Sequence, residues 1–197
     1  MVGKSFTLIA TLIVLTVSAA VLMWNFMRDE DKTYKNTVYG YELNYPRSLD
    51  AKEYSDDNVV FGLITKDAVV ARAEARVITA QGESGQSLED AVADQLKNYC
   101  TADSPSESFS CADTISTEPF ATENGNAGFV LMLKGKLKNI SSGAEREIPK
   151  GPYYVVTLAS SPTISTVLVV SPPLNQTAPD ADSHLIKTIA VSTYLTK

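Results

Sequence analysis

Alternation of apolar and polar side chains marks the first strand. Tyr39, Tyr41, Leu43 and Tyr45 alternate with small or polar residues. This period of two predicts a strand with one buried face, and Pro46 ends it because proline cannot donate to a sheet.

The next two patterns predict a meander. Residues 59–64 form a continuous apolar run, which is typical of a strand buried on both faces. Residues 69–80 alternate, with Arg72, Glu74 and Arg76 expected on one face and small apolar residues on the other.

Two segments have helical spacing. Ser87 is a good N-cap, and Asp90 completes a capping-box-like pair. An apolar stripe follows from Leu88 to Tyr99, so a helix is expected from Ser87 to near Cys100. A second amphipathic helix is expected over residues 185–193.

The remaining patterns are again those of strands. They are expected over residues 113–120, 128–138, 153–158 and 166–170, with a turn at Asn124-Gly125 and a loop over residues 139–150. The sequence therefore predicts an α+β domain, with a mostly antiparallel β-sheet of about seven strands flanked by two helices.

The N-terminal part has a different pattern. Residues 6–24 are nineteen residues without a charge, which as a helix span roughly 28 Å, the thickness of a bilayer's hydrocarbon layer. Trp24 is placed as an interfacial aromatic, and charged residues follow it. A retained transmembrane anchor is favoured over a cleaved signal peptide, because cleavage after Ala19 would leave an exposed apolar tail.

This pattern predicts four parts. They are a cytoplasmic N-terminus (residues 1–5), a transmembrane anchor (6–27), a juxtamembrane linker (28–36) and an extracytoplasmic α+β domain (37–197). Lys4 and the α-amino group favour a cytoplasmic N-terminus by the positive-inside rule. The expected location is thus a single-pass membrane protein with its domain outside the cytoplasm.

The cysteines agree with an oxidising compartment. Cys100 and Cys111 enclose a polar, serine-rich stretch that is typical of a loop closed by a disulfide. Two free buried thiols are the main alternative. A metal site would need more ligands than these two, and His184 is distant in sequence.

Charge limits the choice of partners. Seventeen Lys and Arg against 23 Asp and Glu give a net charge of −6, so the protein repels phosphate backbones. We therefore expect no nucleic-acid partner. We expect the membrane, through the N-terminal helix, and a protein partner at or near it.

A family resemblance rests on the opening of the domain and on the order of its elements. Tyr39-Gly40-Tyr41 followed by Tyr45-Pro46 resembles the opening motif of the PsbP-like proteins, which include the extrinsic subunit of photosystem II. The capped helix from Ser87, the strand from Gly128 and the final helix follow in the order of that family. The resemblance implies an αβα sandwich and a docking or assembly role, and it carries over no functional residue.

The N-terminus is also similar to that of type IV prepilins. Residues 4–9 resemble the prepilin start, although Ser5 replaces the glycine before the processing site and Ala10 replaces the usual glutamate. A pilin-like subunit is therefore an alternative function.

The search for chemistry gives no catalytic residue, no cofactor site and no metal site. Asp180, Asp182 and His184 are best explained as acidic residues before a helix with a histidine on its first turn, and an acid/base or metal cluster is the alternative. An extracytoplasmic enzyme therefore remains a second alternative.

Three other groups have ordinary structural explanations. Asp56-Asp57-Asn58 is a turn rather than a calcium loop, and Tyr39, Tyr41 and Tyr45 are core residues rather than the lining of a cleft. A third group is basic and is expected on a solvated sheet face rather than in a binding spot: Lys134, Lys136, Lys138, Arg146 and Lys150.

These expectations combine into one hypothesis. The protein is a membrane-anchored extracytoplasmic binding or assembly module without enzymatic activity.

Overall fold

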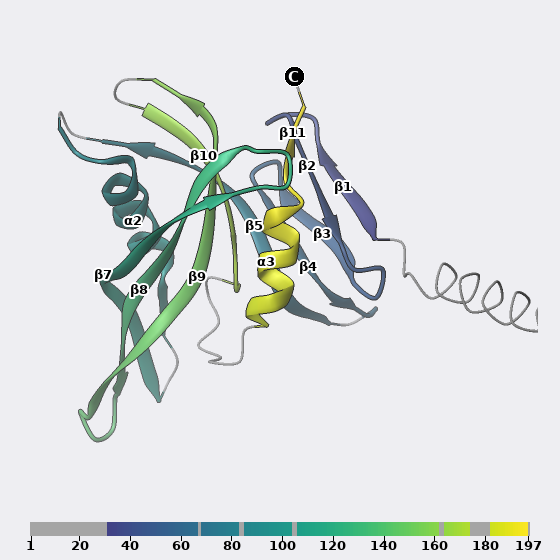
Figure 1. Cartoon of the computed structure of the whole chain (residues 1–197). Coiled ribbons are helices and arrows are strands. Elements are labelled where there is room, and N and C mark those ends of the chain that lie inside the picture. The colour runs from purple at the N-terminus through teal and green to yellow at the C-terminus, as the bar shows by residue number, and fades with distance from the viewer. Residues whose placement is uncertain are drawn as a thin grey trace, which may run out of the picture. The chain divides into compact units, whose positions relative to one another are not determined.

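Two antiparallel sheets and two helices make up the described part of the computed structural model (Figure 1). The structure describes residues 31–66, 68–82, 85–103, 106–161, 164–173 and 182–196. Their strands are β1 (Lys32–Asn36), β2 (Tyr41–Tyr45), β3 (Asp50–Ser55), β4 (Asn58–Ile64), β5 (Val69–Gln81), β6 (Thr101–Asp103), β7 (Glu107–Ala121), β8 (Ala127–Asn139), β9 (Glu145–Ser160), β10 (Ile164–Ser171) and β11 (Tyr194–Leu195). The helices are α2 (Leu88–Tyr99) and α3 (Ser183–Val191).

The larger sheet has eight strands in the order β3-β4-β5-β10-β9-β8-β7-β6, and the smaller has three in the order β1-β2-β11. Every pairing is antiparallel. The mostly antiparallel α+β architecture with two helices is thus confirmed for the described residues. The single sheet of about seven strands is corrected to two sheets, with eleven strands among the residues that the structure describes.

The central strands of the large sheet are apolar on both faces. In β10, Leu168 and Val170 face one core, whereas Val167 and Val169 face the other. β5 divides its side chains in the same way, because successive residues of a strand point to opposite faces. Both faces of the sheet therefore need a cover.

Helix α2 covers one face and contacts β5, β7 and β8. Ser87 is its N-cap, as predicted, and accepts a hydrogen bond from the backbone N–H of Asp90. Val92 and Leu96 are fully buried against Leu131, Tyr153 and other residues of this α2-side core. Burying each such aliphatic side chain contributes about 1.5–3 kcal/mol.

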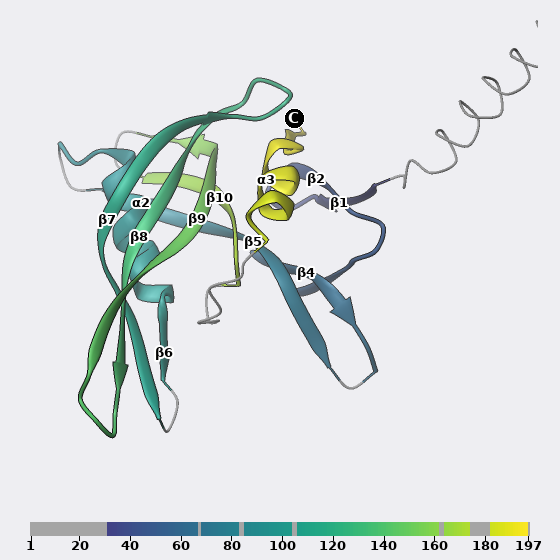
Figure 2. The same ribbon diagram turned by 60° about the horizontal axis from the view of Figure 1, so that its bottom comes forward.

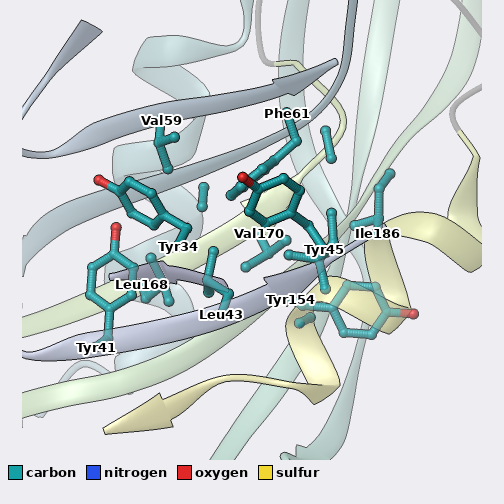
Figure 3. Packing of buried hydrophobic residues seen from close by; sticks show 14 of the residues in the cluster. Tyr34, Tyr41, Leu43, Tyr45, Val59, Phe61, Tyr154, Leu168, Val170 and Ile186 are labelled. Carbon is teal, nitrogen blue, oxygen red and sulfur yellow. The ribbon is translucent and has the colours of Figure 1, made fainter. Parts of the chain in front are cut away.

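The other face is covered by α3 together with the small sheet (Figures 1 and 2). Ile186 and Ile189 of α3 are fully buried in this α3-side core. Tyr41 and Leu43 of β2 are also fully buried there, and Figure 3 shows their side chains among those of the large sheet.

The predicted N-terminal parts lie largely outside the described residues. The cytoplasmic end (1–5), the anchor (6–27) with its alternatives, and residues 28–30 of the linker are among the residues not described. In the segments that are described, no helix is long and apolar enough to cross a membrane. Lys32–Asn36, predicted as linker, is strand β1, so the compact unit begins at Lys32 rather than at residue 37.

Two predicted loops are also strands. Most of the stretch between the cysteines forms β6 and the start of β7, which pair as a hairpin. The predicted loop over residues 139–150 is reduced to a turn, since β9 begins at Glu145 and pairs with the end of β8.

Gly128 allows β8 and β9 to approach each other. A Cβ at this position would lie 2.0 Å from the carbonyl oxygen of Val155. We expect Gly128→Ala to lower the free energy of unfolding by about 1–3 kcal/mol, as overpacking of a core does. Urea unfolding monitored by circular dichroism measures this change.

Gly82→Ala is the matched control. Its Cβ would meet other atoms no closer than 3.7 Å. An equal loss of stability in both variants would contradict the close-approach explanation.

Candidate functional site at the start of the domain

A pocket of about 350 Å³ opens beside the first residues of the domain. The connection between β2 and β3, strand β5 and the N-terminus of α3 each contribute to its lining: Pro46, Ser48, Leu49, Arg72, Asp182 and Leu185. Three segments that are distant in sequence thus meet in one polar recess.

Arg72 reaches this pocket because of a bulge. Phe61 pairs with Ala73, but the next residue, Gly62, pairs with Ala71, so Arg72 is the extra residue of β5. A bulge of this kind redirects a side chain. Leu49 and Leu185, which share the pocket, belong to or pack against the α3-side core. The alternation in the sequence had placed Arg72 on the same face as Glu74 and Arg76.

Gly62 is required at this bulge. A Cβ there would lie 2.2 Å from the carbonyl oxygen of Val70, on the opposite strand. The bulge therefore depends on a residue without a side chain.

The pocket combines opposite charges. Arg72 offers a guanidinium, and Ser48 offers a hydroxyl. Asp182 is the N-cap of α3, and its carboxylate accepts a hydrogen bond from the backbone N–H of Leu185 at 3.0 Å. Together these side chains can bind a small polar or zwitterionic ligand through hydrogen bonds.

Lys32 ties the first strand to this end of the domain. Its ammonium donates to the carbonyl oxygen of Leu49 and to the carboxylate of Asp50, each at 2.8 Å. Because Leu49 also lines the pocket, the start of the domain lies next to it.

The acidic group before the last helix has the expected structural role where it is described. Asp182 caps α3, and His184 lies exposed in the first turn of the helix. Asp180 lies outside the described residues. In the part of the chain that the structure describes, no three His, Cys, Asp or Glu side chains are grouped as metal ligands would be.

Cys100 and Cys111 form the predicted disulfide, with their Cα atoms 5.6 Å apart. Cys100 is the C-cap of α2, so the bond ties the end of this helix to β7. Its sulfur lies 3.6 Å from the hydroxyl of Tyr153, and Phe109 and Leu137 pack around it. The disulfide therefore lies in a small apolar cluster of its own.

The predicted basic group is divided between solvent and interior. Lys134 and Lys138 form ion pairs with Glu147 and Glu145 of β9, at 2.7 and 3.6 Å. These pairs confirm a solvated sheet face with charges of both signs. Lys150 does not belong to it, because its side chain is buried, with its ammonium 5.4 Å from the centre of the Phe109 ring. Burial lowers the pKa of Lys150.

The sequence did not reveal a partly buried ion pair near the end of α2. Arg76 donates twice to one oxygen of Glu74, at 2.6 and 2.8 Å, although Glu74 is only 4% exposed. The guanidinium also lies 5.1 Å from the centre of the Tyr99 ring, at the end of α2. The alternation had placed both charges on one face of the strand, with no partner named for either. An Arg and a Glu two residues apart on a strand were the only signal available.

The predicted turn at Asp56 and Asp57 and the predicted tyrosine core are both confirmed. Asp56 and Asp57 form the turn between β3 and β4, where the side chain of Asn36 donates to the carbonyl oxygen of Asp56 at 2.7 Å. Tyr41 and Tyr45 are core residues, and Tyr39 packs against the same core.

Tyr34 of β1 joins these aromatic side chains (Figure 3), a role that the linker prediction missed. Its ring centre lies 6.2 Å from that of Tyr41 and 6.1 Å from that of Phe61. Its hydroxyl donates to the Glu53 carboxylate at 2.8 Å. Burial, and next this hydrogen bond, raise the pKa of Tyr34 to about 12.

No family model matches the chain, and no curated protein matches it. Solved structures that are similar to it include cyanobacterial PsbP (CyanoP) from Synechocystis sp., with 15% identity and a TM-score of 0.41, over 85% of this chain and 93% of that chain. Another is a protein of Bacteroides thetaiotaomicron, with 15% identity and a TM-score of 0.34, over 84% of this chain. The match spans 48% of that second protein. Membership of the PsbP-like family stays a prediction from the opening motif.

Stability should fall in alkaline solution. The pKa of Tyr34 is raised from 10.0 to about 12 in the folded protein. The contribution of Tyr34 to the free energy of unfolding is therefore complete below pH 10 and is lost as the pH rises towards 12. Burial also raises the pKa of Tyr41 and of Tyr153. We expect the urea unfolding free energy to decline above pH 10, and to decline less steeply in Tyr34→Phe.

Tyr194→Phe is the control, since the ring of Tyr194 is exposed. A Tyr34→Phe variant with the slope of the wild type would contradict the role assigned to Tyr34.

Removing the disulfide should also destabilise the domain. The bond closes a short loop, with a sequence separation of 11, and the loop-entropy model gives roughly 2–3 kcal/mol. We expect the double variant Cys100→Ala, Cys111→Ala to lose this amount in urea unfolding. The wild type, purified without reductant, should show no free thiol after denaturation.

Proposed function

We propose that this protein is a membrane-anchored, extracytoplasmic binding module whose pocket beside Lys32 holds its partner. The anchor is the uncharged stretch of residues 6–24, and the domain begins only eight residues after Trp24. Eight residues reach at most about 28 Å. A domain on so short a tether stays close to the bilayer.

The observation that carries this proposal is the position of the pocket. Lys32 binds the backbone of Leu49, which lines the recess, so the recess lies at the tethered end of the domain. A partner at or near the membrane would meet this end first. The guanidinium of Arg72 and the carboxylate of Asp182 give the recess polar groups for recognition.

The role as an assembly or docking factor is the finer part of the proposal. It agrees with the resemblance of the Tyr39–Pro46 segment to the PsbP-like opening motif. The partner we expect is another protein of the same membrane.

Photo-crosslinking in the native membrane tests the proposal. We expect the full chain to resist extraction by alkaline carbonate, and its domain to be cleaved by protease added from the non-cytoplasmic side. A photoreactive residue at Ser48 should give one reproducible adduct, and Arg72→Ala should reduce its yield.

Thr79 is the control position, because it is exposed near the other end of β5. Equal adducts from Ser48 and Thr79 would contradict a specific pocket. Release by carbonate would contradict the anchor.

A further inference from the structure

The β4–β5 hairpin continues beyond the core and is apolar at its tip. Leu63 pairs with Val70, and Ile64 pairs with Val69. Leu63 and Val70 are 46% and 50% exposed, and none of the four side chains belongs to a core cluster of the described residues. The side chains of neighbouring cross-strand pairs point to opposite faces of a sheet, so the tip of the hairpin is apolar on both faces. Figure 2 shows the hairpin projecting away from the rest of the sheet.

The turn of this hairpin satisfies much of its own hydrogen bonding. The backbone N–H of Thr65 donates to the carbonyl oxygen of Ala68 at 2.8 Å. The Thr65 hydroxyl donates to the same oxygen and accepts from the N–H of Ala68, both at 3.1 Å. Polar groups that are already paired are less costly to move out of water.

The hairpin leaves the sheet next to the start of the domain. Gly62, the last residue before the apolar tip, pairs with Asp50, and Asp50 forms an ion pair with Lys32 at 2.8 Å. The chain that precedes Lys32 carries the uncharged stretch of residues 6–24. The apolar tip therefore leaves the sheet close to Lys32, the first residue of the compact unit.

We propose that the tip of the β4–β5 hairpin docks into the interfacial layer of the bilayer that holds the N-terminal anchor. This inference rests on the proposed function, since it takes residues 6–24 as membrane-embedded. Two exposed aliphatic side chains on one face of the ribbon and two half-buried ones on the other match a medium that surrounds them more closely than they match a flat protein surface.

Charges limit the depth of this contact. Lys66 in the turn is exposed, and Asp67 follows it in the sequence. A lysine at this level can extend its ammonium to the headgroup phosphates while its alkyl chain stays in the apolar layer. The tip therefore lies at the boundary of headgroups and acyl chains and does not span the bilayer.

The single tryptophan of the chain makes a direct test possible. Trp24 of the wild type reports on the anchor, and a Trp24→Phe, Val70→Trp variant reports on the hairpin. Each full-length protein is reconstituted into phosphatidylcholine vesicles with and without lipids brominated near the headgroup end of the acyl chains. Bromine quenches tryptophan only at short range.

We expect blue-shifted emission and about two-fold quenching for Val70→Trp, because interfacial segments lie at this depth. Trp24→Phe, Ile164→Trp is the matched control. Ile164 is an apolar residue 45% exposed at a strand end, and it pairs with Gln81 at the opposite end of β5. It should emit as in water and remain unquenched.

The outcomes separate the inference from the proposed function. If Trp24 is quenched and Val70→Trp is not, the hairpin contact is overturned but the membrane anchor is supported. Unquenched Trp24 overturns the anchor and the inference together. Blue-shifted but unquenched Val70→Trp emission also overturns the bilayer contact. If this blue shift increases with protein density in the vesicle, the tip is covered by a second copy of the chain instead.

A second hairpin variant controls for misfolding caused by the Val70→Trp substitution. Trp24→Phe, Leu63→Trp places the probe on the same face, opposite Val70. Thermal unfolding of each variant in vesicles should match that of Trp24→Phe. If both hairpin probes are folded and unquenched, the proposal is wrong.

Discussion

Both faces of the central strands are apolar, and the rest of the domain is arranged around this constraint. Neighbouring residues such as Val167 and Leu168 are both fully buried, although they point to opposite sides of the sheet. Neither side can be left to water without losing several kcal/mol of burial energy. Helix α2 covers one side, and α3 with the small sheet covers the other. The small sheet is thus part of the core's cover and not an appendage.

The sequence predicted the central strands well and missed the edges. The four unpredicted strands are β1, β3, β6 and β11, which are the two edges of each sheet. An edge strand has neighbours on one side only, and these four are short or largely exposed where their burial is described. Apolar alternation depends on one buried face, so it is weak where little is buried. The pairing that defines such strands comes from residues elsewhere in the chain.

The candidate site was less predictable for a related reason. Alternation places Arg72 beside Glu74, but the bulge at Gly62 shifts the register by one residue and moves this side chain to the pocket. The lysines of β8 were harder to interpret because their partners, Glu145 and Glu147, lay in a segment predicted as a loop. The disulfide, the N-cap Ser87 and the core positions of Tyr41 and Tyr45 depend on local patterns, and these could be predicted.

The small sheet joins the two ends of the domain on one strand. β2 pairs with β1 on one side and with β11 on the other, and the backbone N–H of Thr196 donates to the carbonyl oxygen of Gly40 at 2.8 Å. During synthesis, β1 and β2 emerge first but cannot complete this layer while α3 and β11 are still inside the ribosome. The aromatic side chains of β2 therefore stay partly uncovered until α3 and β11 have left the ribosome. Pairing of β11 with β2 is therefore the step that completes the cover of the α3-side core.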